Sequence, residues 1–220
     1  MTQLALRRIP RRKLVASEPA PLDLFATVFK TALGWTAIAQ DDEMLLGVVF
    51  GHASLRQATD ALKSNLQRTH AAAAVVDLVD AEEQPKSIRR VIAGLERYAV
   101  GDDVDFGDVA IDERHLTSFG RRIVQACRRI PAGQTRSYGE LAAQCGSPGA
   151  ARAVGQVMAK NRYPLVVPCH RVLAAGGLLG GFSAPQGLAM KRRLLAMESA
   201  INLEVARSTA SRCRLTRYNG

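Results

Sequence analysis

The sequence predicts an α+β fold in which a small N-terminal α/β domain is followed by a mainly helical C-terminal domain with a helix-turn-helix. Three observations predict this fold: apolar runs of strand length in the first half, helical spacing of apolar residues from Leu116 onward, and a concentration of positive charge in the second half. The expected boundaries are a flexible basic arm over 1–20, an N-terminal support domain over 21–112, a C-terminal domain over 113–200 and a basic tail over 201–220.

The N-terminal domain is expected to contain a strand pair, two helices and a further strand. An acidic turn at Asp41 and Asp42 separates the two apolar runs of the strand pair, and the hydroxyl of Ser54 can cap the first helix. The expected elements are strands at 35–39 and 45–50, helices at 55–66 and 88–98, and a strand at 104–111. Because none of these segments carries a recognisable chemical motif, we expect this domain to support the other one.

Positive charge is concentrated in the second half of the chain. Residues 1–115 hold 14 Lys and Arg against 17 Asp and Glu, whereas residues 116–220 hold 16 against 3. A strongly basic surface attracts phosphates and raises the rate of encounter with a polyanion. We therefore expect the C-terminal domain to bind nucleic acid. The basic arm is expected to be a solvated segment, with an accessory contact to DNA as the alternative.

The cysteines indicate free thiols. None of the four has CxxC spacing or belongs to a Cys/His cluster of zinc-site spacing: Cys127, Cys145, Cys169 and Cys213. Free thiols are typical of a reducing compartment, so a cytoplasmic location is expected, or a nuclear one in a eukaryote. We expect no metal, no cofactor and no membrane partner, since no apolar run reaches the ~18 residues of a membrane span.

The segment from Ser137 to Lys160 predicts the helix-turn-helix. Ser137 and Glu140 have the spacing of a capping box, and a short helix through Gln144 is followed by a glycine turn. A second helix is expected over 150–160, with Ser147 as its N-cap and a proline in its first turn. The small residues of this second helix permit close approach to DNA but are unsuited to reading base edges.

A reactive centre is indicated at Cys169 and His170, which follow a buried apolar run and Pro168. A cysteine becomes a strong nucleophile only as a thiolate, so it needs a base or a cation nearby. Adjacent residues of a strand point to opposite sides, so His170 serves Cys169 only if the chain turns after Pro168 or a water bridges the two. Adjacency alone is more typical of a structural cysteine.

The chain resembles the methylated-DNA–protein-cysteine methyltransferases, also called O6-alkylguanine-DNA alkyltransferases. The resemblance runs from about Phe119 to Glu198 and rests on three motifs and one further residue: Pro168-Cys169-His170-Arg171-Val172, Ser137-Tyr138-Gly139-Glu140-Leu141-Ala142, Ala151-Arg152-Ala153-Val154-Gly155, and Asn161. It implies a ribonuclease H-like N-terminal domain. It also implies irreversible, single-turnover transfer of an alkyl group from O6-alkylguanine, and from O4-alkylthymine, to the protein.

The resemblance assigns the catalytic roles. Cys169 is the implied alkyl acceptor, and His170 is the implied base, acting through a water. Glu198 is implied to orient and polarise the imidazole, as in other nucleophile–base–acid relays. Asn161 is implied to hold the turn between the second helix and the reactive cysteine.

The resemblance also assigns contacts with DNA and with the extruded base. Double-stranded DNA is the implied partner, bound by a monomer through the helix-turn-helix in the minor groove. Arg152 is implied to fill the gap left by the flipped nucleotide, although the residues alone fit a phosphate contact equally well. Ala151 lies beside it. The implied pocket consists of Tyr138, Val172, Phe182 and Ser183, with the carbonyls of Cys169 and Val172 accepting from the guanine amine.

Three features depart from the family pattern. Arg162 follows Asn161 where the family often has proline, and Phe182 replaces a frequent tyrosine. The loop from Ser183 to Gly187 is longer than the shortest family form, which affects the alignment of Ser183 and Glu198. Near this loop we expect a hairpin, with 172–174 and 178–180 as its strands, and an amphipathic helix that carries Leu188, Lys191, Leu194, Leu195 and Glu198.

Two other functions compete with alkyl transfer. A non-catalytic DNA-binding regulator would use the helix-turn-helix and would not need Cys169. A Cys-His hydrolase would turn over repeatedly on an acyl substrate, and it gives no reason for the basic half. Transfer to a thiol explains both features, because it needs DNA and a single reactive sulfur.

Overall fold

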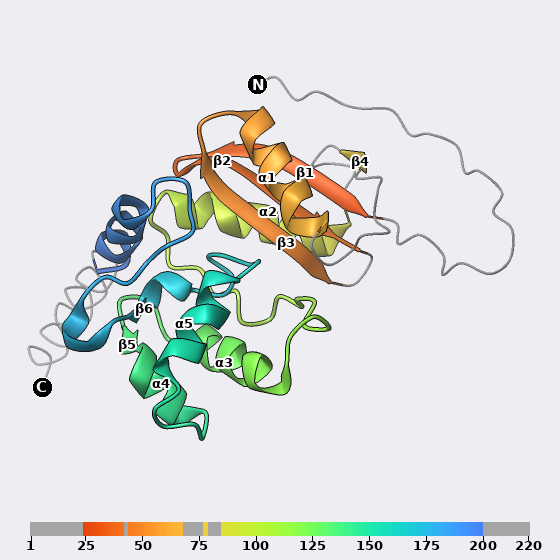
Figure 1. Cartoon of the computed structure of the whole chain (residues 1–220). Coiled ribbons are helices and arrows are strands. Elements are labelled where there is room, and N and C mark those ends of the chain that lie inside the picture. The colour runs from red at the N-terminus through yellow and green to blue at the C-terminus, as the bar shows by residue number, and fades with distance from the viewer. Residues whose placement is uncertain (1–23, 42–43, 68–76, 79–84, 200–220) are drawn as a thin grey trace, which may run out of the picture.

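The computed structural model describes residues 24–41, 44–67, 77–78 and 85–199. The expected basic arm, the basic tail and Cys213 lie outside the described residues. The sheet and its two helices, α1 and α2, lie on one side of the molecule, and helices α3, α4 and α5 gather on the other (Figure 1). The predicted α+β class is confirmed.

The N-terminal sheet is an antiparallel meander with one added parallel strand. Strands β1 (Phe25–Thr31), β2 (Gly34–Gln40) and β3 (Leu45–His52) pair in order, and β4 (Asp77–Leu78) joins β1, so the strand order is β3-β2-β1-β4. The expected strand pair at 35–39 and 45–50 is therefore confirmed as β2 and β3. Gly34 permits the tight turn from β1, because its φ of 114° and its approach to His52 leave no room for a Cβ.

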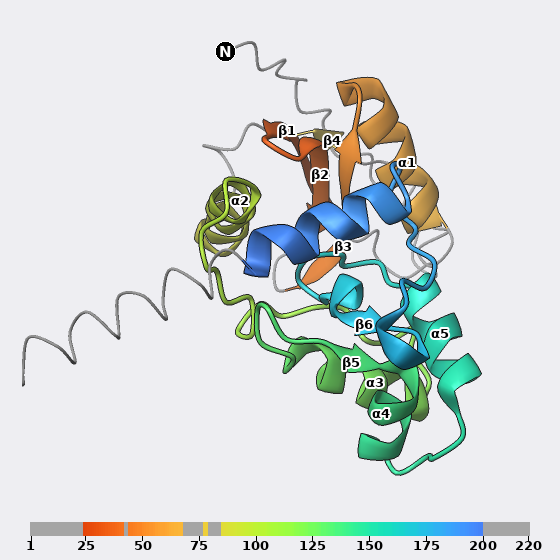
Figure 2. The ribbon, with the colours of Figure 1, turned by 90° about the vertical axis from the view of Figure 1, so that its left-hand side faces the viewer.

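Helices α1 (Leu55–Gln67) and α2 (Lys86–Ala99) cover opposite faces of this sheet (Figure 2). The expected helices are confirmed, and Ser54 caps α1 by accepting from the backbone of Gln57 at 3.3 Å. Apolar residues alternate along the strands, so one set packs on α1 and the other faces α2. The α2 face belongs to a core that also includes Ile123, Leu141 and Leu194, so both halves of the chain share it.

The expected strand at 104–111 is wrong. This segment turns at Gly107, whose backbone N–H donates to Asp105 Oδ1 at 2.7 Å, and only Ile111 forms a bridge, to Leu45. The carboxylate supplies the partner that a neighbouring strand would have supplied. Arg128 also satisfies this backbone, because its Nη2 donates to the carbonyls of Phe106, Gly107 and Val109 at 2.8, 3.1 and 2.7 Å.

The C-terminal half contains the expected pair of helices. Helix α3 (Ser118–Arg128) precedes the short strand β5 (Arg136–Ser137), and α4 (Tyr138–Gln144) and α5 (Ala151–Ala159) follow. Both hydrogen bonds of the predicted capping box between Ser137 and Glu140 are present. Ser147 is not the N-cap of α5: Gly149, at a φ of 89°, interrupts helical geometry, so the cap position falls on Ala150.

The segment after α5 contains short turns and one long helix. A 3₁₀ turn, η1 (Cys169–Arg171), leads into β6 (Val172–Leu173), which pairs with β5, and a second turn, η2 (Ala175–Gly177), follows. The expected hairpin at 172–180 is wrong: Val172 and Leu173 pair with β5 instead, and residues 178–180 form no strand, although the Ala174 N–H donates to the Leu178 carbonyl at 2.8 Å. The expected amphipathic helix is confirmed at 188–199, running between the sheet and the other half (Figure 2).

Replacing Arg128 with methionine should lower the free energy of unfolding by about 2 kcal/mol, because three carbonyls of the 106–109 segment lose a charged donor. Arg129→Met is the matched control, since its side chain is exposed and its loss should change stability by less than about 0.5 kcal/mol. Urea denaturation of the two variants measures both values. Equal stability of the two would contradict the assigned role of Arg128.

Candidate active site

Cys169 and His170 lie on the turn η1, which directs both side chains inward. The backbone N–H of Arg171 donates to the Pro168 carbonyl at 2.9 Å, so the chain turns where the sequence required it to turn. Cys169 is 6% exposed and His170 is fully buried. Because η1 is a turn and not a strand, the side chains of Cys169 and His170 do not point to opposite sides of the chain as they would in a strand.

Asn161 holds the turn that connects α5 to Cys169. Its Nδ2 donates to the Val167 carbonyl at 2.9 Å, its Oδ1 accepts from the Tyr163 backbone at 3.0 Å, and its side chain also lies within hydrogen-bonding reach of the thiol. The carbonyl of Arg162 accepts from Val48 of β3 at 2.8 Å. The sheet thus fixes the turn at the position where the family often has proline.

Glu198 is the centre of a buried hydrogen-bond network. Its Oε1 lies 2.8 Å from Nε2 of His170 and accepts from Nη2 of Arg171 and from the hydroxyl of Tyr98, both at 2.8 Å. Arg171 Nε adds contacts to both oxygens, and the Gly133 backbone reaches Oε2 at 3.3 Å. The carboxylate is completely buried, so these donors replace the hydration that it loses on folding.

Hydrogen bonding to Glu198 determines the charge of this network. Burial alone raises the pKa of Glu198, but the hydrogen bonds and charges of His170 and Arg171 outweigh it and hold the pKa at about 2. Burial lowers the pKa of His170; Glu198 opposes this shift, whereas the charges of Arg171 and Lys191 add to it. The site therefore combines an ionised Glu198 with a neutral imidazole.

The neutral imidazole has one nitrogen available for proton transfer. Nε2 of His170 faces Glu198, whereas Nδ1 is buried and has no hydrogen-bond partner among the described residues. A carboxylate can only accept, so the proton belongs on Nε2 and the lone pair on Nδ1. This lone pair can take a proton from a neighbouring group, which is the requirement for a general base.

The Cys169 sulfur is a thiol at neutral pH. Burial raises the pKa of Cys169, and the hydrogen bond of Asn161 and the charge of Lys191 offset this only in part. Lys191 is completely buried and donates from Nζ to the Val172 carbonyl at 2.7 Å. A carbonyl oxygen has two lone pairs, so Val172 keeps one acceptor site for a further donor.

The remaining predicted site residues lie around this centre. Tyr138 begins α4 and is half-buried. Its hydroxyl packs closely on Gly180: a Cβ added to Gly180 would lie 2.8 Å from the hydroxyl oxygen. Burial raises the pKa of Tyr138, and the nearby Cys169 raises it further. Ala151 and Arg152 begin α5, where the arginine is exposed. These residues place one phenol within electrostatic reach of the sulfur and one guanidinium on the outer surface.

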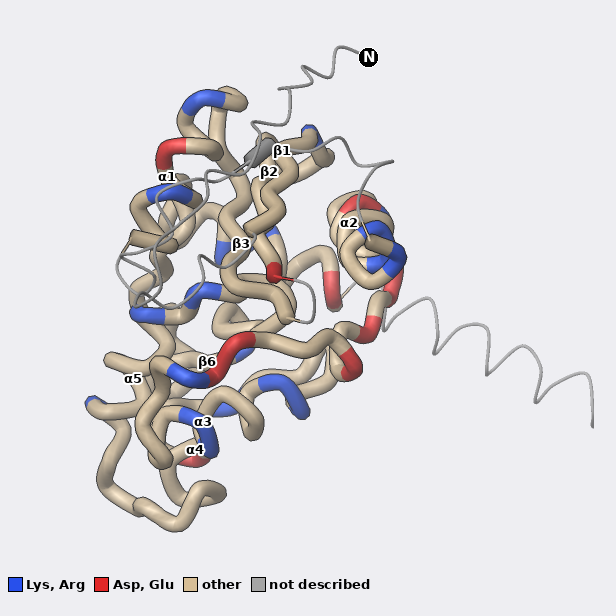
Figure 3. The backbone as a smooth tube through the Cα atoms, turned by 90° about the vertical axis from the view of Figure 1, so that its right-hand side faces the viewer, with Lys and Arg blue, Asp and Glu red and all other residues tan. Residues whose placement is uncertain are grey.

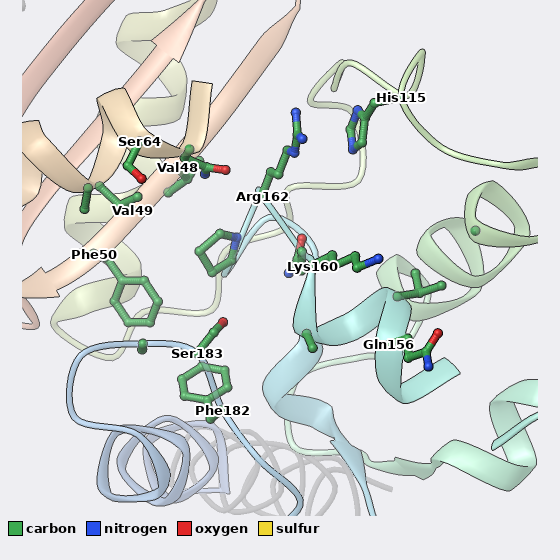
Figure 4. A pocket seen from close by; sticks show the side chains of 18 of the residues that line it. Val48, Val49, Phe50, Ser64, His115, Gln156, Lys160, Arg162, Phe182 and Ser183 are labelled. Atoms are coloured by element: carbon green, nitrogen blue, oxygen red, sulfur yellow. The ribbon is translucent and has the colours of Figure 1, made fainter. Parts of the chain in front are cut away.

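Phe182 and Ser183 lie farther toward the sheet. They line a groove between β3, α1 and α5, together with Phe50, Lys160 and Arg162 (Figure 4). The ring of Phe182 packs edge-on against Phe50, with ring centroids 6.4 Å apart. Cys169 and His170 are not among the residues that line this groove, so it lies beside the reactive centre and not over it.

Charge is distributed unevenly over the described backbone. Basic positions follow α3 and its neighbours, whereas acidic positions gather beside α2 and along the segment leading to α3 (Figure 3).

Among the described residues, no group of three or more His, Cys, Asp or Glu side chains is placed to hold a metal ion. None of the helices in the described part of the chain has the length and apolar character that crossing a bilayer requires.

Three residues of this site were not predicted to act in it. Arg171 is part of a family motif, but the sequence predicted no role for it. Lys191 was predicted only to lie on an amphipathic helix. Tyr98 belongs to the N-terminal domain, which was expected to act as a support. A lysine on the apolar side of an amphipathic helix was a usable signal. Nothing local marks Tyr98, because its partners are 72 and 100 positions away in the chain.

Comparison with known sequences gives one consistent family. The sequence profile described as "6-O-methylguanine DNA methyltransferase, DNA binding domain" matches residues 118–200. A methylated-DNA–protein-cysteine methyltransferase of Mycolicibacterium paratuberculosis is 45% identical over 116 residues, which cover 53% of this chain and 68% of the relative. One from Methanothermobacter thermautotrophicus is 35% identical over 120 residues, covering 54% and 65%.

Solved structures extend the similarity into the N-terminal half. Mycobacterium tuberculosis OGT in complex with DNA aligns with a TM-score of 0.61 at 31% identity, over 80% of this chain and 93% of that one. The O6-methylguanine-DNA methyltransferase of Pyrococcus kodakaraensis aligns with a TM-score of 0.56 over 80% and 98%; at 23% identity, it supports the fold alone.

Replacing Glu198 with glutamine should lower the free energy of unfolding by about 3 kcal/mol at neutral pH, because Arg171 is left buried without its counter-charge. The pKa of Glu198 is about 2 in the folded chain against an ordinary 4.5, so its contribution is complete above pH 4.5 and is lost as the pH falls toward 2. Urea denaturation between pH 7 and pH 3 should show a constant difference from wild type that narrows only below 4.5. A difference that stays constant throughout would contradict the assignment.

Proposed function

The chain belongs to the methylated-DNA–protein-cysteine methyltransferase family and is an O6-alkylguanine-DNA alkyltransferase that repairs DNA, and on this premise we propose that Cys169 is its alkyl acceptor. The observation that carries the proposal is the buried pair of His170 and Glu198 directly after the buried Cys169, with the lone pair of Nδ1 left for proton transfer. The other described cysteines, Cys127 and Cys145, are followed in the chain by Arg128 and Gly146 and have no adjacent histidine.

In the proposed reaction, His170 removes the thiol proton of Cys169 through a bridging water. The thiolate then attacks the alkyl carbon of O6-alkylguanine, forming a C–S bond as the C–O bond breaks, and guanine leaves with the electron pair and regains a proton. Glu198 stabilises the imidazolium formed on the way. The product is a thioether with no route back to the thiol, so each protein molecule acts once.

The damaged base has to leave the duplex before it can meet a buried sulfur. We assign residues 113–200 to DNA binding and alkyl transfer and residues 21–112 to support, with α4 and α5 held in the minor groove of double-stranded DNA by a monomer. Arg152, exposed at the start of α5 beside Ala151, takes the place of the extruded nucleotide. Its contacts offset the few kcal/mol that unstacking costs.

Four residues are proposed to form the base pocket. Tyr138, which lies within electrostatic reach of Cys169, donates to the extruded base while crowding the 3′ phosphate. Ser183 faces the O6 atom, Phe182 forms a wall, and Val172 accepts from the exocyclic amine through the lone pair that Lys191 leaves unused. O4-alkylthymine presents a similar alkyl ether and is proposed as a second substrate. No cofactor takes part.

Duplex DNA carrying labelled O6-methylguanine should transfer one label per protein molecule, and the label should lie on the peptide that contains Cys169. Cys169→Ser should transfer none, because the hydroxyl is a far weaker nucleophile. Cys145→Ser is the matched control, since that half-buried thiol lies on the turn between α4 and α5 and should be dispensable. Repeated turnover, or label on another residue, would contradict the proposal.

Arg152→Ala should slow methyl transfer from duplex DNA by about 10- to 100-fold, because the energy that offsets extrusion of the base is lost. Transfer from the free base O6-methylguanine, which needs no extrusion, should be unchanged. Arg56→Ala, which removes an exposed arginine of α1, is the control and should leave both rates unchanged. Single-turnover kinetics on the two substrates measure the effect, and equal slowing on both would argue against insertion into the duplex.

A further inference from the structure

Tyr98 is the one contribution of α2 to the buried network, and the proposed reaction assigns it no role. Its hydroxyl donates to Oε1 of Glu198 at 2.8 Å and lies 3.3 Å from Nε2 of His170. The side chain is 3% exposed. A buried tyrosine therefore contacts both the base and the carboxylate that orients it, from the half of the chain that was expected to be inert.

The ring of Tyr98 is held in place by packing on two sides. Its centroid lies 6.3 Å from that of Phe106, edge-on, and 6.5 Å from that of His170. Burial, with Glu198 adding to it, raises the pKa of Tyr98 far above its ordinary value, so the hydroxyl keeps its proton at any pH at which the protein acts. Tyr98 is thus a permanent hydrogen-bond donor of fixed position.

The hydroxyl affects His170 in two ways. Glu198 can only accept, so the single proton of Tyr98 points to Oε1, and the phenolic oxygen presents a lone pair toward Nε2. Both neighbours of Nε2 therefore favour a proton on that nitrogen and leave the lone pair on Nδ1. Tyr98 and His170 both use Oε1 of Glu198 as their acceptor. The hydrogen bond from Tyr98 therefore reduces the negative charge on Oε1 that would stabilise a protonated His170.

The other groups that face His170 act together with Tyr98. Glu198 and Lys191 approach from the helix at 188–199, and Arg171 and Cys169 lie on its own turn. Of these, only Glu198 favours the imidazolium, and Tyr98 is the neutral donor that moderates it. Removal of its hydroxyl should therefore strengthen the ion pair and make His170 easier to protonate.

On the basis of the proposed function, we propose that Tyr98 is a positioning residue for alkyl transfer. Its hydroxyl holds His170 as a neutral base with the lone pair on Nδ1, by occupying Glu198 from the N-terminal half. The N-terminal half is then required for the reaction as well as for the core, because it completes the network that acts on Cys169.

The test compares Tyr98→Phe with Tyr163→Phe in the full chain. Tyr163 is also buried, and its hydroxyl donates to a backbone carbonyl, that of Asp112, at 2.6 Å, so the control loses a hydroxyl of similar burial outside the network. Two readouts are needed: the pH dependence of single-turnover methyl transfer, and the ¹⁵N shifts of the His170 ring, which report its tautomer and its protonation without reference to activity.

Tyr98→Phe should slow transfer about fivefold at the plateau, the effect of one lost neutral hydrogen bond. It should move the midpoint of the pH profile upward by about half a unit or more, toward the ordinary histidine value of about 6.5. The His170 shifts should show the same upward movement and a mixture of tautomers, whereas Tyr163→Phe should keep the wild-type profile. Introducing 3-fluorotyrosine at position 98, a stronger donor on an intact ring, should move the midpoint downward.

A wild-type midpoint and a single tautomer in Tyr98→Phe would overturn the inference, as would an equal shift in Tyr163→Phe. If Tyr98→Phe does not fold, the fluorinated chain decides, and an unchanged midpoint there would overturn it. A wild-type chain that transfers no label to Cys169 would instead overturn the proposed function, and this inference with it.

Discussion

The buried carboxylate of Glu198 is the group on which the reactive centre depends. It is completely buried, and it accepts hydrogen bonds from three side chains that come from different parts of the chain: Tyr98 from α2, and His170 and Arg171 from η1. A desolvated carboxylate is tolerated only when donors of this kind surround it. One charge therefore connects the helix at 188–199, the turn η1 and α2, which also share the hydrophobic core.

This constraint also determines the resting state of the site. Burial keeps the pKa of His170 below its ordinary value although Glu198 opposes the shift, and burial likewise keeps the pKa of Cys169 above its ordinary value. A permanent thiolate would react with many electrophiles in the cell and would be consumed without repairing DNA. Keeping the sulfur protonated until a damaged nucleobase is bound suits a protein that acts only once.

The sequence was informative where the information was local. The capping box at Ser137, the N-cap at Ser54 and the turn after Pro168 each depend on residues within a few positions of one another. The strand expected at 104–111 failed because Asp105 satisfies the backbone of Gly107 locally, and the hairpin expected at 172–180 failed because Val172 and Leu173 pair with the distant strand β5. Tyr98 and Lys191 could not be assigned, since their roles arise only when distant segments pack together. The roles of all the predicted site residues, those of Arg152, Phe182 and Ser183 included, stay predictions.

Ionisation of Cys169 in the free protein tests this account most directly. With Cys127, Cys145 and Cys213 replaced by serine, the ultraviolet absorbance of the thiolate reports Cys169 alone as the pH is raised. The account predicts no thiolate signal at neutral pH and a transition above the ordinary cysteine value of 9.0, because burial outweighs the stabilising groups. A thiolate already present at pH 7, with its transition below neutrality, would mean that the site holds a preformed ion pair and would contradict the account.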